Sequence, residues 1–200
     1  MRASRQDAGV LVITVLAALA FGLDMAILVG VGLSILLFVP RAARLKFAEL
    51  TVDPDGVVRE RLPEEPPASA FLLYDLEGEL FFGAAPELDR CFAEIDRRVE
   101  AAKLSHVVLR VKRVRNPDVV CLERLEHFLR VAPTSGVTVL LAGVRPDLLE
   151  AFERLRFSAW LPADRIFPQA ADEDSATLAA IRVVYDQIGD DPASRLYYQI

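Results

Sequence analysis

The side chains that most often carry chemistry are scarce in this sequence, which has cysteine only at 91 and 121 and histidine only at 106 and 127. Both cysteines fall in apolar periodic stretches, which favours buried free thiols over a disulfide framework. Cys121 and His127 are six positions apart on one expected helix, a spacing that does not make them neighbours. No histidine has a partner at metal-ligand spacing, and no catalytic motif occurs. We therefore expect no enzyme activity, no metal site and no cofactor.

One loop offers groups suited to binding an anion or a partner. Arg113, Arg115 and Asn116 come shortly before Asp118, where a helix is expected to begin. Cationic side chains beside a helix N-terminus favour phosphate. The alternative is a solvated loop with scattered charge, and the sequence has no glycine-rich phosphate loop of the Walker type. We take Arg115, Asn116 and Asp118 as a candidate interaction surface, with helix capping as the alternative role of Asp118.

Alternating strands and helices must position this loop. Strands are expected at 70–76, 79–82, 106–111, 137–142 and 165–167, with the first two joined into a hairpin by a tight turn at 77–78. Helices are expected to begin at Pro86, after Asp118, at Pro146 and near Ser175, and the last should stop at Gly189. This order, β–β–α–β–α–β–α–β–α, predicts an α/β fold with a mostly parallel sheet and flanking helices.

The beginning of the chain is of another kind, because residues 9–39 hold a single charge, Asp24. One helix of that length would exceed a bilayer core of about 30 Å and would bury Asp24 near its centre. Two helices at about 9–21 and 25–39, turning at 22–24, fit better, and basic residues flank both ends. We predict a short transmembrane hairpin with both ends on the cytoplasmic side. Each helix is short for a full span, which favours packing against other membrane helices.

Composition divides the chain into a hairpin at 1–46, a linker at 47–69, an α/β domain at 70–189 and a tail at 190–200. The linker has two short expected strands, at 47–52 and 57–61, and a proline-rich end at 62–68. Residues 1–46 carry a net charge of +3, so the rest of the chain carries −9 of the total of −6. An acidic domain argues against a nucleic-acid partner, whereas the apolar hairpin predicts a lipid bilayer as one.

The order of these segments resembles the last two membrane helices and the STAS domain of SulP-type (sulfate permease) inorganic anion transporters. The likeness is carried by 24–38 (DMAILVGVGLSILLF), 74–85 (YDLEGELFFGAA), 107–125, 166–168 and 175–185. It implies a STAS-like fold, an inner-membrane location with the STAS domain cytoplasmic, and a membrane transport domain or other membrane helices as partner. It also allows a homodimer.

Two departures from the family limit what the resemblance implies. About a dozen earlier membrane helices, which build the anion site in the family, are not in this sequence, so the chain alone is not expected to transport. The sequence fits a fragment, one half of a split transporter or a remnant. In STAS domains that act as anti-sigma-factor antagonists, Asp-Ser-Gly or Asp-Thr-Gly supplies a phosphorylated hydroxyl. Here Val120 stands at the acceptor position and Cys121 at the glycine, which excludes a phosphate switch at Val120.

Two functions from different classes follow. The first is a membrane-anchored STAS module of an anion transporter, which regulates or assembles it through protein contact. The second is a self-sufficient membrane-tethered sensor or scaffold that binds a nucleotide or a partner protein. The anion, if any, stays open.

Overall fold

The computed structural model describes residues 5–53, 57–66, 70–169 and 175–189. It divides the chain into two compact units, Met1–Ala43 and Arg44–Ile200. The tail predicted at 190–200 lies outside the described residues.

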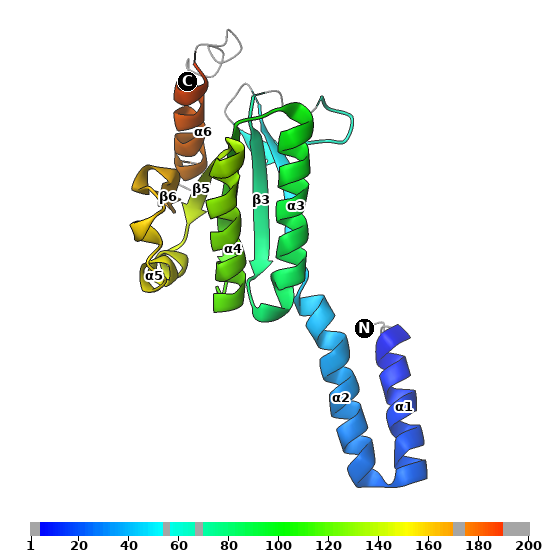
Figure 1. The fold of residues 1–200 in the computed structure, drawn as a ribbon. Coiled ribbons are helices and arrows are strands. Elements are labelled where there is room, and N and C mark those ends of the chain that lie inside the picture. Colours follow the sequence, from blue (N-terminus) through cyan, green and yellow to red (C-terminus); the bar gives the residue numbers. More distant parts are fainter. Residues whose placement is uncertain (1–4, 54–56, 67–69, 170–174, 190–200) are drawn as a thin grey trace. The chain divides into compact units, whose positions relative to one another are not determined.

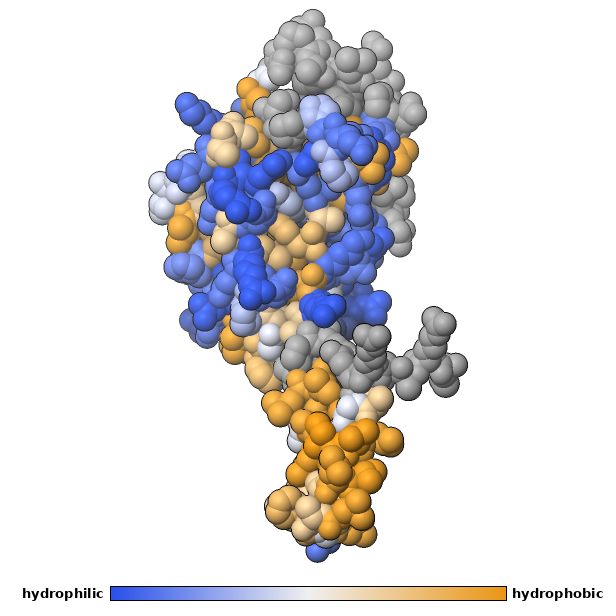
Figure 2. Space-filling view, turned by 90° about the vertical axis from the view of Figure 1, so that its right-hand side faces the viewer, coloured by the Kyte–Doolittle hydropathy of each residue, from blue (hydrophilic) through white to orange (hydrophobic). Residues whose placement is uncertain are grey.

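The first unit is a helical hairpin of α1 (Arg5–Phe21) and α2 (Leu23–Ala42), joined at Gly22. Ala17 and Ala26 are buried, and a Cβ on Gly30 would lie 3.2 Å from Thr14 Oγ1, so small residues line the contact between the helices. Large apolar side chains instead face outward (Figure 2). They include Leu11, Val12, Ile13, Val15, Leu16, Leu19, Phe21, Leu23, Met25, Ile27, Leu28, Val31, Ile35 and Leu36.

The predicted helical hairpin is therefore present, but its predicted transmembrane character is not supported. No helix in the described part of the chain combines the length and the hydropathy that a membrane crossing requires. The 17 residues of α1 extend for about 25 Å at about 1.5 Å per residue, which is less than a bilayer core of about 30 Å.

The second unit contains a six-stranded mixed sheet in the order β2-β1-β3-β4-β5-β6. Strand β1 is antiparallel to β2 and β3, whereas β3, β4, β5 and β6 run parallel. The strand bounds are Lys46–Val52 (β1), Val58–Glu60 (β2), Leu72–Glu79 (β3), His106–Arg115 (β4), Thr138–Val144 (β5) and Ile166–Pro168 (β6). The predicted α/β fold is confirmed, and the two strands expected in the linker pair with the sheet.

The β-hairpin predicted at 70–82 is wrong. Residues 72–79 form one strand, β3, which continues through the supposed turn and ends before a short 3₁₀ turn, Phe82–Ala84. Gly78 has a φ of 139°, and the pairing register with β4 shifts between Asp75 and Glu77. A Cβ on Gly78 would lie 2.9 Å from Leu45 Cδ2. This glycine therefore marks a strand irregularity with a close approach of another chain segment, and not a turn.

Four helices connect and cover the strands: α3 (Ala85–Ala102), α4 (Val119–Val131), α5 (Pro146–Arg154) and α6 (Ser175–Ile188). All four lie where the apolar periodicity predicts them. Pro86 and Pro146 occupy first-turn positions, where a missing N–H is tolerated. In Figure 1, α3 and α4 lie on the same face of the sheet, on either side of β3.

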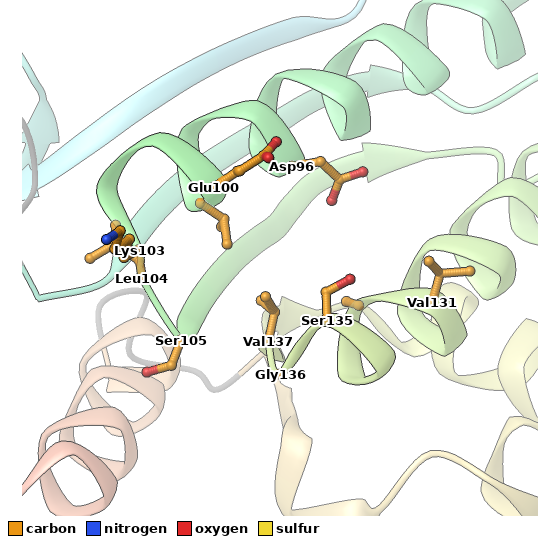
Figure 3. Close-up of a pocket in the computed structure, with 11 residues that line it drawn as sticks. Asp96, Glu100, Lys103, Leu104, Ser105, Val131, Ser135, Gly136 and Val137 are labelled. Carbon is orange, nitrogen blue, oxygen red and sulfur yellow. The ribbon is translucent and has the colours of Figure 1, made fainter.

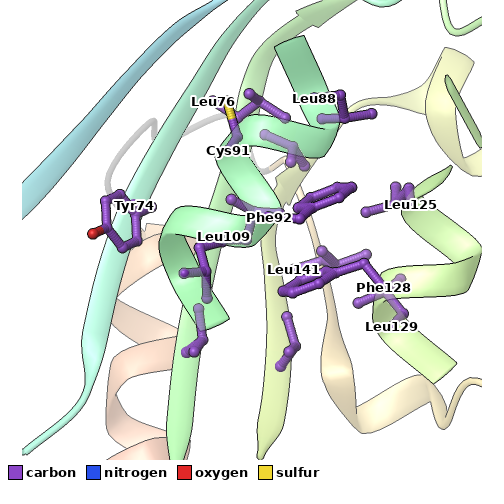
Figure 4. Packing of buried hydrophobic residues seen from close by; sticks show 14 of the residues in the cluster. Tyr74, Leu76, Leu88, Cys91, Phe92, Leu109, Leu125, Phe128, Leu129 and Leu141 are labelled. Atoms are coloured by element: carbon purple, nitrogen blue, oxygen red, sulfur yellow. The ribbon is translucent and has the colours of Figure 1, made fainter. Parts of the chain in front are cut away.

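The two faces of the sheet support separate apolar clusters. Leu76, Leu109 and Leu141 point to the face covered by α3, α4 and α5, where Phe92 stacks on Phe128 at a centroid distance of 4.2 Å (Figure 4). Their neighbours in the strands point to the other face and pack against α6. That second cluster comprises Leu50, Phe71, Leu73, Val108, Leu140, Ala142, Ala180, Ile181 and Val184.

Candidate functional site

The loop that carries Arg115, Asn116 and Asp118 lies where β4 passes into α4, at the carboxyl end of the parallel strands. Two backbone hydrogen bonds join it to the end of β3: Leu80 N donates to Arg115 O at 2.8 Å, and Asp118 N donates to Leu80 O at 2.7 Å. Asn116 takes a left-handed conformation with φ of 49°, which turns the chain toward α4. The loop is therefore held by the sheet.

Asp118 caps α4. Its Oδ1 accepts a hydrogen bond from Val120 N at 2.8 Å, which satisfies one of the free N–H groups at the helix start. The predicted capping role is thus present in the structure. Val120 lies in the first turn of α4 and is 39% exposed, so the position predicted to correspond to a phosphate acceptor reaches solvent but carries only methyl groups.

Acidic and basic side chains alternate around this loop. The side-chain amide of Asn116 donates to Glu79, and Arg113 pairs with Glu77 at 3.0 Å. Arg115 is exposed and has no ion-pair partner among the described residues. Because Glu77 neutralises Arg113 and Glu79 adds a second carboxylate beside Asn116, the loop does not present the concentrated positive charge that a nucleotide phosphate favours.

An exposed apolar group borders the same loop. Phe82 is 64% exposed and Val119 is 55% exposed, next to the exposed Val120. Phe82 belongs to the 3₁₀ turn that contacts α4. The Cys121 thiol also ties these elements together, because it donates to Phe81 O at 3.1 Å. The arrangement suits contact with a protein better than catalysis. Phe82 and Val119 were not among the residues that the sequence singled out, since single exposed apolar residues carry no pattern.

Neither cysteine is activated as a nucleophile, and His106 lies at the start of β4, at the other end of that strand from the loop. Both cysteines are buried and free, as predicted. Burial raises the pKa of Cys91 to about 12 and that of Cys121 to about 11, so both stay protonated and poorly nucleophilic near neutral pH. His106 contacts Ser105 Oγ at 2.9 Å and Gln187 Oε1 at 3.0 Å. Within the described residues, no group of acidic, cysteine and histidine side chains is arranged to hold a metal.

A buried charge pair was missed by the sequence reasoning. Asp75 on β3 and Arg110 on β4 are register partners, and they are 8% and 7% exposed. Arg110 Nε lies 3.8 Å from Asp75 Oδ1, and neither atom has a hydrogen-bond partner among the described residues. Burial raises the pKa of Asp75, while Arg110 and Arg113 oppose that shift. The sequence signal for this pair was the presence of one charged residue in each of two apolar strands, Asp75 in 70–76 and Arg110 in 106–111.

The class of the protein follows from a family match to the α/β domain. The STAS domain family matches residues 63–173, so the chain belongs to that family. The predicted resemblance to the STAS module of SulP-type transporters is confirmed. No curated protein sequence matches significantly.

Solved structures extend the likeness beyond the domain. The murine anion transporter Slc26a9 in the inward-facing state is 15% identical with a TM-score of 0.72, and the match covers 90% of this chain and 29% of that one. A second structure of SLC26A9 is 16% identical with a TM-score of 0.66, covering 92% and 32%. A sulfate transporter family protein from Wolinella succinogenes is 24% identical with a TM-score of 0.46, covering 66% and 99%. This chain thus spans less than a third of the length of the first two transporters.

Proposed function

We propose that this chain is a membrane-anchored STAS module of a SulP-like anion transporter, which regulates or assembles the transport domain by protein contact and does not transport alone. In this proposal the STAS domain is cytoplasmic, at the inner membrane, and the chain acts by binding, not by catalysis. The structural likeness to Slc26a9 supports the fold on which the proposal depends. Residues 44–200 are less than four fifths of the chain, so a match over 90% includes part of the hairpin.

The observation that carries the proposal is the reversed exposure of the hairpin. Leu19 is 81% exposed and Leu28 is 67% exposed, whereas the small residues Ala17 and Ala26 are buried between the helices. A hairpin with this distribution is unfavourable in water, because large apolar side chains remain hydrated. Since neither described helix combines the length and the hydropathy for a crossing by itself, we propose that they enter the membrane by packing against helices of the transport domain.

The loop at the start of α4 offers a contact surface for the second half of the proposal. Exposed apolar residues border it, Phe82 from the 3₁₀ turn and Val119 and Val120 from α4. Its backbone is held by the two hydrogen bonds that Leu80 makes with Arg115 and Asp118. A preformed apolar surface binds a partner without a large ordering cost. Since Val120 has no hydroxyl, contact here would not be switched by phosphorylation of that residue.

The test is membrane association of the full chain. We expect the wild-type chain to remain in the membrane pellet after extraction at alkaline pH, and the double variant Leu19→Arg/Leu28→Arg to be released. Each arginine costs about 2.5–3.5 kcal/mol within the hydrocarbon region. Val57→Arg serves as the matched control, because Val57 is an exposed apolar residue of the second unit. A wild-type chain that is monomeric and soluble without detergent would refute the anchoring.

Assembly with a transport domain is tested separately. Photo-crosslinking from position 82 or 119 in native membranes should join the chain to a larger membrane protein. Liposomes holding the chain alone should show no sulfate uptake above empty liposomes. Uptake by the chain alone, or crosslinks only to a second copy, would contradict the assembly role while leaving the anchoring result standing.

A further inference from the structure

A groove lies between the carboxyl-terminal ends of α3 and α4, at the amino-terminal ends of β4 and β5. The groove is therefore at the opposite end of the parallel strands from the α4 loop. Its volume is about 690 Å³. Figure 3 shows Asp96 and Glu100 projecting from α3 on one side, with Val131 and Ser135 on the other. The apolar lining residues are Val99, Leu104, Val131, Ala132 and Val137.

The two carboxylates of the groove differ from the other charges of α3. The remaining charged residues of the helix are paired: Glu87 with Arg90, Asp89 with Arg124, Glu94 with Arg97, and Arg98 with Glu49. Within the described ranges, Asp96 and Glu100 have no such partner. The helix thus neutralises its carboxylates everywhere except at the groove.

Other groups at the groove do little to offset this negative charge. Lys103, in the left-handed conformation that ends α3, is the only cation among the lining residues against two carboxylates. The last carbonyl groups of α3 also face this end and carry partial negative charge. Burial raises the pKa of Asp96, as expected for a carboxylate that is partly desolvated without a cation beside it.

We propose that this groove binds a short segment of a partner protein in which a bulky apolar side chain is flanked by Lys or Arg. The apolar floor takes the bulky side chain, and Asp96 and Glu100 pair with the flanking cations. The volume is in the range of pockets that bind small ligands, so it holds one or two side chains and not a folded domain. An acidic segment is excluded by repulsion from the same two carboxylates.

The experiment is a fluorescence anisotropy titration of the purified full chain with a labelled peptide that has one leucine between two pairs of arginines. Asp96→Asn/Glu100→Gln should weaken binding about tenfold, since each lost ion pair contributes up to about 1 kcal/mol. The matched control is Glu87→Gln/Glu94→Gln, which removes the same charge from the same helix outside the groove. It should change the affinity less than about twofold.

Two further measurements separate this site from general attraction to an acidic chain. A peptide with serine in place of leucine should bind about tenfold more weakly, because the apolar floor is then unused. Val131→Gln, at a residue that is 44% exposed, should weaken binding of the leucine peptide only. No measurable binding of the leucine peptide, or equal losses in the groove variant and the control, would overturn the proposal.

Discussion

The two faces of the sheet are made by the same strands but are closed differently. Toward α3, α4 and α5, the inward residues of β3, β4 and β5 are apolar along the whole covered length. Toward α6, the row of Leu73, Val108 and Leu140 is apolar, but the next row places Asp75 beside Arg110. The cluster on the first face contains no charged side chain. The second face retains a desolvated ion pair two residues further along the strands.

This difference separates stability from specificity. Apolar burial stabilises the fold in proportion to the area removed from water, whatever the exact partner. A buried ion pair rarely adds net stability, because desolvation offsets the attraction, but it strongly penalises loss of either partner. We therefore expect the face toward α3 to determine how stable the domain is. The face toward α6 should determine which arrangement of β3 and β4 is tolerated.

The largest effect should come from the first face. Phe157 is fully buried, and its ring packs edge-on against the rings of Phe152 and Trp160, with centroid distances of 4.5 and 5.0 Å. Phe157→Ala should lower the free energy of unfolding by about 3–5 kcal/mol, measured by urea denaturation of the full chain. Phe82→Ala is the control, since Phe82 is 64% exposed, and it should change the value by less than about 0.5 kcal/mol. Equal losses would remove the distinction between core and surface.

The charge pair on the second face gives the next effect. Arg110→Met should lower the free energy of unfolding by about 3 kcal/mol, because Asp75 loses its buried partner and keeps the half-exposed Arg113, 4.0 Å from its Oδ2, as a weaker one. The double variant Asp75→Leu/Arg110→Met should recover most of that loss, since both charges are then replaced by apolar side chains. Urea denaturation of the two variants beside the wild type measures the coupling. If the double variant is as unstable as Arg110→Met, the pair is not a desolvated unit and the contrast between the faces fails.

Much of this architecture follows from local sequence. The starts of α3 and α5 at prolines, the Asp118 cap of α4 and the apolar stripe of α6 all depend on residues within one or two turns. The edge strand β6 was also predicted from its own residues, because short apolar runs between turn signals indicate strands. Such features need no knowledge of what lies across the sheet.

Features that depend on distant residues could not be predicted in the same way. Gly78 indicates a turn from its neighbours alone, but it pairs with Val114 of β4 within a continuous strand, and Leu45 lies close to it. The strand expected at 47–52 was assigned to a linker because the pairing of β1 with β3 spans more than twenty positions. The pair of Asp75 and Arg110 and the groove beside Asp96 likewise arise only when β3, β4 and the helices are assembled.

A smaller effect is expected at Asp118, whose carboxylate accepts a hydrogen bond, whereas Asp75 Oδ1 accepts none among the described residues. Asp118→Ala should lower the free energy of unfolding by about 1 kcal/mol, because Val120 N loses its acceptor. Asp118→Asn keeps an oxygen acceptor and should recover most of this stability. Thermal unfolding followed by circular dichroism distinguishes the two variants. A loss as large as that of Arg110→Met would mean that Asp118 does more than cap α4.

The smallest effect is a pH dependence that Asp75 should add on its own. Its pKa in the folded chain lies above the ordinary value of 3.8, since burial disfavours the ionised form. Between these two pKa values the folded chain holds a proton that the unfolded chain has released. The free energy of unfolding therefore falls as pH rises through that window, because ionised Asp75 is less favourable in the folded chain.

This contribution is isolated by comparing the wild type with Asp75→Asn, which cannot titrate at this position. The difference in the free energy of unfolding, Asp75→Asn minus wild type, should increase as pH rises from below 3.8 and then level off above the raised pKa. The increase should be modest, because Arg110 and Arg113 both favour the ionised carboxylate and partly offset its burial. A difference that decreases with pH would show that attraction to the two arginines outweighs desolvation. The face toward α6 would then hold a stabilising ion pair, and the contrast with the apolar face would lie in chemistry alone and not in stability.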